Sequence, residues 1–170
     1  MLTVLRNTHK MRQASKLYKP ALTNSDLTAQ IVALCEGEDD KITIMATVAC
    51  QLYQEVDGFD WVGFYRVVEG ELLKIGPYQG GHGCLVIPFA RGVCGAAARD
   101  QKIKIVEDVT KFEGHIACSA RTRSELVIPC FDQTGELFSV LDIDSNQPAF
   151  FTKQDAHDLD QLMRKLFMGV

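Results

Sequence analysis

Residues 125–144 read ELVIPCFDQTGELFSVLDID, and this stretch decides the class of fold. Two runs rich in apolar residues, 125–131 and 137–144, flank the turn-forming residues at 132–135. This pattern predicts a β-hairpin of two antiparallel strands. Asp142 and Asp144 alternate with apolar residues in the second run, so a strand places both on one face.

The segments around this hairpin predict further strands and several helices. The expected helices cover about 26–36, 40–55, 96–100 and 152–167, and the expected strands cover 59–68, 71–78, 84–88 and 103–106. Consecutive strands joined by short turns indicate a mainly antiparallel sheet, and the N- and C-terminal helices must cover one face of it. We therefore expect a single α+β domain of the GAF or PAS kind over 25–170, preceded by an N-terminal segment, 1–24.

Composition limits the class of function. The chain has 170 residues, a net charge of −4 and scattered basic residues, so neither nucleic-acid nor membrane-surface binding is indicated. No apolar stretch approaches the ~20 residues of a membrane span. The basic N-terminal segment lacks the apolar core of a signal peptide, so we expect a cytoplasmic protein. Its Arg, Lys and Ser content makes a mitochondrial presequence the weaker alternative.

Cys118 is the first candidate for chemistry among the six cysteines. It lies in a long polar loop, 107–123, with His115 before it and Arg121 and Arg123 after it. Positive neighbours lower the pKa of a thiol and favour the reactive thiolate. A buried loop cysteine without a chemical role is the alternative.

Cys84 and Cys94 are the next candidates. Cys84 follows a Gly-rich turn, 79–83, and Cys94 is expected just before a small helix. Further thiols near a thiolate are what a sulfenic-acid cycle requires, because a second thiol condenses with Cys–SOH to form a disulfide. Both could instead be small core residues. The remaining cysteines are expected to serve packing: Cys35, Cys50 and Cys130.

A zinc site is the rival use of these thiols. His82-x-Cys84 and His115-x-x-Cys118, together with Cys94, could supply a Cys/His ligand set. There is no C-x-x-C pair, and the spacings match no common zinc module, so we expect no metal.

Acidic and aromatic residues outline a binding site. If Glu125 begins the partner strand, it converges with Asp142 and Asp144, and mutual repulsion should raise at least one pKa. Such a group can hold an ammonium or donate a proton, although a solvated acidic face is the alternative. Trp61 and Tyr65 share a strand face and, with Tyr78, could wall a small pocket or simply pack in the core.

The motifs together resemble the free methionine-(R)-sulfoxide reductases, which are single GAF-domain proteins. The matching segments are DWVGFY (60–65), GPYQG (76–80), Cys84 before VIP, RGVCGAA (91–97), EDV (107–109), GHIAC (114–118), SELVIP (124–129) and LDIDS (141–145). The combination of GHIAC with LDIDS and RGVCG is specific, whereas any one of them alone is weak. The chain departs from the family at Ser119, where an acid often follows the GHIAC cysteine.

The resemblance implies roles for the three cysteines. Cys118 is implied to be the catalytic thiol, Cys84 the resolving thiol, and Cys94 a third thiol that supports the resolving step. The residues alone do not rank Cys84 against Cys94. The resemblance also implies that Glu125, Asp142 and Asp144 hold the substrate and that Trp61 is the pocket aromatic.

The implied reaction is reduction of free L-methionine (R)-sulfoxide. Cys118 attacks the sulfur, a carboxylic acid protonates the oxygen, and a disulfide then forms and is reduced by thioredoxin or a similar dithiol. No metal or organic cofactor is required, and an exposed sheet edge or helix face could support a homodimer. A non-catalytic ligand sensor and a thiol redox switch are the rival functions.

Overall fold

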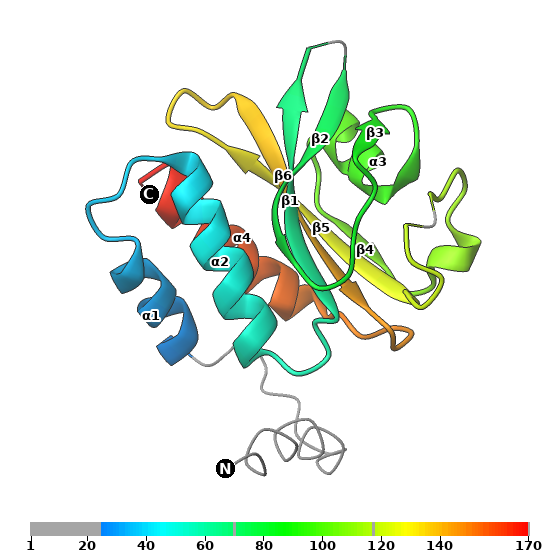
Figure 1. The fold of residues 1–170 in the computed structure, drawn as a ribbon, viewed down its shortest axis with the longest axis horizontal. Coiled ribbons are helices and arrows are strands. Elements are labelled where there is room, and N and C mark those ends of the chain that lie inside the picture. Colours follow the sequence, from blue (N-terminus) through cyan, green and yellow to red (C-terminus); the bar gives the residue numbers. More distant parts are fainter. Residues whose placement is uncertain (1–24, 70, 117, 170) are drawn as a thin grey trace, which may run out of the picture.

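A computed structural model describes residues 25–69, 71–116 and 118–169 of the chain. These residues form a six-stranded sheet with helices on both of its faces (Figure 1). The N-terminal segment, where the presequence alternative falls, lies outside the described residues, as does the residue at position 70. The strand order is β3-β2-β1-β6-β5-β4, and every neighbouring pair is antiparallel. The predicted α+β class with a mainly antiparallel sheet is confirmed.

The elements lie close to their predicted bounds. In chain order they are α1 (Ser25–Leu34), α2 (Lys41–Glu55), β1 (Trp61–Val68), β2 (Leu72–Gln79), β3 (Val86–Pro88), α3 (Gly92–Asp100), β4 (Lys104–Val106), the 3-10 turn η2 (Val109–Lys111), β5 (Ser124–Phe131), β6 (Leu137–Ser145) and α4 (Lys153–Phe167). None of the described helices is long and apolar enough to cross a membrane.

Helix α3 begins four residues earlier than predicted. Cys94 therefore lies inside the helix and not before it. Glycines at positions 92 and 95 delayed the predicted start, because glycine is a poor helix former. The fold requires the second of them, since a Cβ on Gly95 would lie 2.4 Å from the carbonyl oxygen of Pro88.

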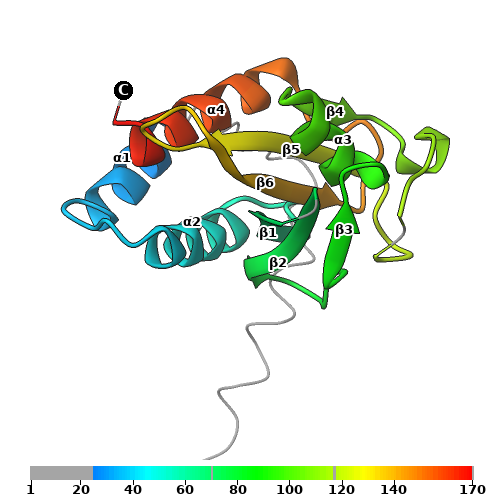
Figure 2. The ribbon, with the colours of Figure 1, turned by 90° about the horizontal axis from the view of Figure 1, so that it is seen from above.

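Helices α1, α2 and α4 cover one face of the sheet, as Figure 2 shows, so the prediction for the terminal helices is confirmed. Side chains of alternate strand residues fill this face and are fully buried, among them Phe64, Leu141 and Ile143. Asp40 caps α2, and a capping box of Thr152 and Asp155 begins α4.

Helix α3 and two loops cover the opposite face, and the strand register places the candidate site there. Trp61 on β1 pairs with Asp144 on β6, and Asp144 pairs on its other side with Glu125 on β5. Asp142 lies two residues before Asp144, so its side chain emerges on the same face. Three neighbouring strands therefore direct polar and aromatic side chains into one space.

Candidate active site

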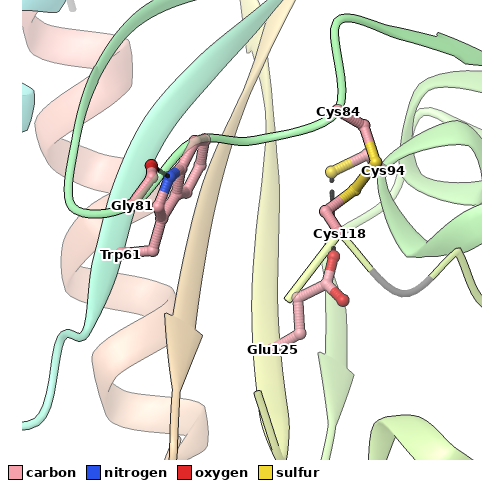
Figure 3. The surroundings of a disulfide bond; sticks show 6 residues. All are labelled: Trp61, Gly81, Cys84, Cys94, Cys118 and Glu125. Atoms are coloured by element: carbon pink, nitrogen blue, oxygen red, sulfur yellow. Dashed lines mark hydrogen bonds between the residues drawn. A yellow bond between two sulfur atoms is a disulfide. The ribbon is translucent and has the colours of Figure 1, made fainter. Parts of the chain in front are cut away.

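A disulfide joins Cys84, between β2 and β3, to Cys118, in the loop before β5 (Figure 3). The two residues are 34 positions apart in the sequence, and their Cα atoms are 5.3 Å apart. This separation lies within the usual range of ~4.4–6.8 Å for a disulfide. The sequence left Cys84 and Cys94 as alternative partners of Cys118, and in this structure Cys84 is the partner.

Cys94 is a free thiol and lines the same pocket as Cys118. Its side chain is 3% exposed, and its Sγ donates a hydrogen bond to Oε1 of Glu125 at 3.7 Å (Figure 3). Burial raises the pKa of this thiol well above its usual value, and the nearby Asp142 and Glu125 charges raise it further. Cys94 is therefore a neutral hydrogen-bond donor to the carboxylates.

The three predicted carboxylates do converge, and the solvated-face alternative is wrong. Glu125 and Asp142 are each only 6% exposed, and Asp144 is partly buried. Burial, followed by the charge of Asp142, raises the pKa of Glu125 well above its usual value. Burial raises the pKa of Asp142 to about 7. Glu125 therefore holds a proton at neutral pH and shares it with Asp142 through a side-chain hydrogen bond.

Asp144 and Thr122 form the outer part of this acidic group. Burial, and then the charge of Asp142, raises the pKa of Asp144 well above its usual value, although a side-chain hydrogen bond with Thr122 opposes the shift. Thr122 is itself 7% exposed and lies in the loop that carries Cys118. Thr122 could not be predicted from the sequence, because no spacing or motif distinguishes this loop threonine from a surface one.

Asp142 also carries a buried oxygen without a partner. Its Oδ1 has no hydrogen-bond donor among the described residues. A buried acceptor left unpaired costs about 1–3 kcal/mol, and more when it is charged. Asp142 lines the candidate pocket, so a ligand there could supply the missing partner.

The aromatic residues form one wall. The Trp61 ring stacks on Tyr65, with centroids 5.9 Å apart, and its Nε1 donates to the carbonyl of Gly81 at 2.8 Å. Burial raises the pKa of Tyr65, so its phenol stays protonated. Tyr78 stacks on Trp61 at 5.5 Å but does not line the cavity, so the prediction that it forms part of the wall is wrong.

These walls enclose a cavity of about 40 Å³ beneath the disulfide. The carboxylates and Cys94 form its floor, and Ile116 and Cys118 lie in the loop above it. Outside lies a groove of about 280 Å³ that shares Trp61, Cys118 and Asp144 with the cavity. The inner cavity has room for a few water molecules and continues into the outer groove.

The basic neighbours expected around Cys118 are only partly present. His115 lines the cavity, but burial lowers its pKa, so the prediction that it is a positive neighbour is wrong. Arg121 lines the outer groove, whereas Arg123 is exposed and does not line it. The sequence could not show the lowered pKa of His115 because it arises from burial in the folded loop.

The remaining predicted residues are the rival zinc ligands and the three cysteines expected to serve packing. The rival Cys/His zinc set cannot form in this structure, since Cys84 and Cys118 are bonded to each other. Cys35 and Cys130 are buried in the helix-covered core, as predicted for packing residues, and Cys50 is only partly buried on α2.

The fold and the pocket between sheet and loop define a GAF domain. No protein-family model matches the chain. A relative from Dictyostelium discoideum, GAF domain-containing protein A, is 41% identical over 141 residues, covering 83% of this chain and 88% of its own length.

More particular relatives share the whole site-bearing region. Free methionine-R-sulfoxide reductase of Escherichia coli strain K12 is 39% identical over 142 residues, covering 84% of this chain and 85% of the relative. The crystal structure of free methionine-R-sulfoxide reductase from Neisseria meningitidis in complex with its substrate matches with a TM-score of 0.78 and 39% identity, covering 82% and 83% of the two chains. The chain belongs to the free methionine-R-sulfoxide reductase family, whose members are oxidoreductases.

Proposed function

We propose that this protein reduces free L-methionine (R)-sulfoxide to L-methionine, with Cys118 as the nucleophile and Cys84 as the resolving thiol. One observation carries the proposal: the Cys84–Cys118 disulfide lies over a pocket lined by the buried carboxyl groups of Glu125, Asp142 and Asp144. Family membership supports the substrate, because the relatives are named for that reaction.

The first step joins Cys118 to the substrate sulfur. The Cys118 thiolate attacks the sulfoxide sulfur, and the oxygen, which leaves poorly unless protonated, takes a proton from a floor acid. The oxygen passes to Cys118, so the substrate sulfur is reduced by two electrons to methionine and the cysteine sulfur is oxidised by two electrons to sulfenic acid. Cys84 then attacks that sulfur, water leaves, and the disulfide forms.

Glu125 is the proton donor in this proposal. Its pKa is raised by burial and by the Asp142 carboxylate, so it carries a proton at neutral pH. Asp142 accepts a hydrogen bond from Glu125 and, after product leaves, can pass a proton taken from solvent back to it. This division follows a general pattern, in which two neighbouring carboxylates with different environments act as acid and base.

The unpartnered Oδ1 of Asp142 and the partly exposed Asp144 then hold the substrate ammonium. A cation compensates buried negative charge, whereas the uncharged amide nitrogen of a protein-bound methionine would not. The Trp61 ring packs against the methyl and sulfur end. These contacts explain a preference for the free amino acid.

Regeneration requires an external dithiol. A thioredoxin-type protein in the cytoplasm would open the disulfide by exchange through a mixed disulfide. The cycle uses no metal and no organic cofactor, because cysteine sulfur carries both electrons.

Turnover of the separated R and S epimers tests the proposal, with a small dithiol as reductant. We expect activity on the R epimer alone, its loss in Cys118→Ser, and no change in Cys50→Ser. The second variant is a matched control, because Cys50 is a free thiol on α2, far from the pocket face. An inactive reduced wild type would contradict the proposal and favour the ligand-sensor alternative.

Single-turnover experiments show whether Cys84 or Cys94 is the resolving thiol. With no reductant added after reduction, Cys84→Ser should yield one methionine per protein and then accumulate a sulfenic acid that a cyclic dione traps. Rapid disulfide formation in Cys84→Ser, lost when Cys94 is also replaced, would assign the resolving role to Cys94.

A further inference from the structure

We propose that the pocket floor is also an inhibitory zinc site, in which Cys94, Glu125 and Asp142 bind Zn²⁺ in place of the substrate. The binding stands on the geometry alone, whereas the inhibition rests on the proposed function. This ligand set differs from the Cys/His set considered as a rival in the sequence, which included Cys84 and Cys118, and the disulfide removes both of those from metal binding.

The three side chains are spaced for one small cation. One ligand atom from each of Cys94, Glu125 and Asp142 lies within 4.8 Å of the other two, and all three residues are buried. Around a tetrahedral zinc, sulfur and oxygen ligands are about 3.3–3.8 Å apart. The Sγ of Cys94 is already 3.7 Å from Oε1 of Glu125 (Figure 3). Only a small side-chain adjustment of Asp142 is needed to complete the set.

An independent observation indicates that the floor accepts a cation. The Asp142 side chain is 6% exposed, yet its Oδ1 has no hydrogen-bond partner among the described residues. The other contacts within the cluster run through protons shared by the thiol and the two carboxyl groups. A divalent cation that replaced these protons would satisfy the orphaned oxygen as well.

The ligand types select the metal. Mg²⁺ and Ca²⁺ take oxygen ligands, so a thiol in the set disfavours both. Zn²⁺ binds thiolate and carboxylate together. Three protein ligands leave a fourth position open, and the cavity of about 40 Å³ above the floor has room for a water there.

Zinc in this position would exclude the substrate. It would occupy the Asp142 oxygen that the ammonium needs, and it would displace the Glu125 proton that the sulfoxide oxygen needs. Inhibition should therefore be competitive with methionine sulfoxide and independent of the reductant.

Binding is tested on the disulfide form, in which Cys84 and Cys118 cannot ligate. We would titrate reductant-free wild type with Co²⁺, whose bond to a thiolate gives a charge-transfer absorption, and then displace the cobalt with Zn²⁺. The expected result is one equivalent bound. The absorption should vanish in Cys94→Ser and persist in Cys50→Ser, which removes a free thiol outside the pocket.

Asp142→Asn provides a variant of unchanged shape. We expect its Co²⁺ affinity to fall at least about tenfold, because loss of outer-shell partners alone costs about 10–100-fold. No thiolate–cobalt absorption in wild type, or an absorption that survives Cys94→Ser, would overturn the site.

Inhibition is tested in a single turnover after the dithiol has been removed, because dithiols chelate zinc. Zinc should slow methionine formation, and excess substrate should restore it, while alkylation of Cys118 by iodoacetamide keeps its rate. Blocked alkylation would instead place the metal on Cys118 and overturn inhibition from the floor. If the zinc-free protein forms no methionine, the proposed function fails, and the cobalt titration still decides the metal site.

Discussion

Asp142 and Ile143 are neighbours on β6, yet they point to opposite faces of the sheet and meet opposite environments. Ile143 is fully buried under the helices, and Asp142 is almost as deeply buried under the loop. The same contrast recurs on β5 between Leu126 and Glu125. Burial by itself therefore does not distinguish the core from the site.

The difference lies in what burial does to the free energy of folding. Burying Ile143 removes apolar surface from water and stabilises the fold. Burying Asp142 costs free energy, because its charged form is desolvated and one oxygen stays unpartnered. The two faces should therefore respond differently to substitution, with stability depending on the first and activity on the second.

Replacement of Glu125 by Gln should give the largest effect. Without the proton donor, we expect kcat/KM for the R epimer to fall by about 10²–10⁴, while the circular dichroism spectrum stays that of the wild type. Ile143→Val on the other face is the control and should keep the wild-type kcat/KM. A fully active Glu125→Gln protein would move the donor role to Asp142 or Asp144.

Ile143→Ala should lower stability and leave activity unchanged. The cavity it leaves on the helix-covered face should lower the free energy of unfolding by about 2–5 kcal/mol, as measured by urea denaturation. At a temperature where the variant is folded, its kcat/KM should be unchanged. A loss of activity without a loss of stability would show that the two faces are coupled through β6.

Reduction of the Cys84–Cys118 disulfide should lower the free energy of unfolding. Closing a loop of 34 residues stabilises a fold by about 2–4 kcal/mol, so a phosphine reductant should lower the free energy of unfolding by that amount. In Cys84→Ser the reductant should have no effect. An equal response in that variant would mean that the reductant acts elsewhere.

The pH dependence of stability should be the most gradual effect. Burial raises the pKa of Asp142 to about 7, above its unfolded value near 3.8. The folded state therefore binds this proton more tightly than the unfolded state. The contribution of this bound proton to the free energy of unfolding is fully present below about pH 4. It decreases as the pH rises from 4 through 7, by at most about 1.4 kcal/mol per pH unit for one proton.

Asp142→Asn should flatten this part of the curve, as measured by denaturation at several pH values. A wild-type stability that rose from pH 4 to 7 relative to the variant would contradict the raised pKa.

Features carried by local pattern could be predicted from the sequence. Alternation along β6 placed Asp142 and Asp144 on one face, and a period of two needs no knowledge of the rest of the chain. The helix predicted over 40–55 agrees with α2 within one residue, and Ile44, Val48 and Leu52 repeat at helical spacing on its buried side. The start of α3 was missed because the need for Gly95 arises from contact with a different segment.

The sequence by itself determined the order and type of the elements, the family resemblance and the candidate thiols and acids, because these follow from residue type and spacing. Only the tertiary structure decided that Cys84 is bonded to Cys118, that Cys94 donates to Glu125, and that His115 is neutral. Each of these depends on distance or desolvation between segments far apart in the chain. Neither quantity exists until the sheet and its loops close over the pocket.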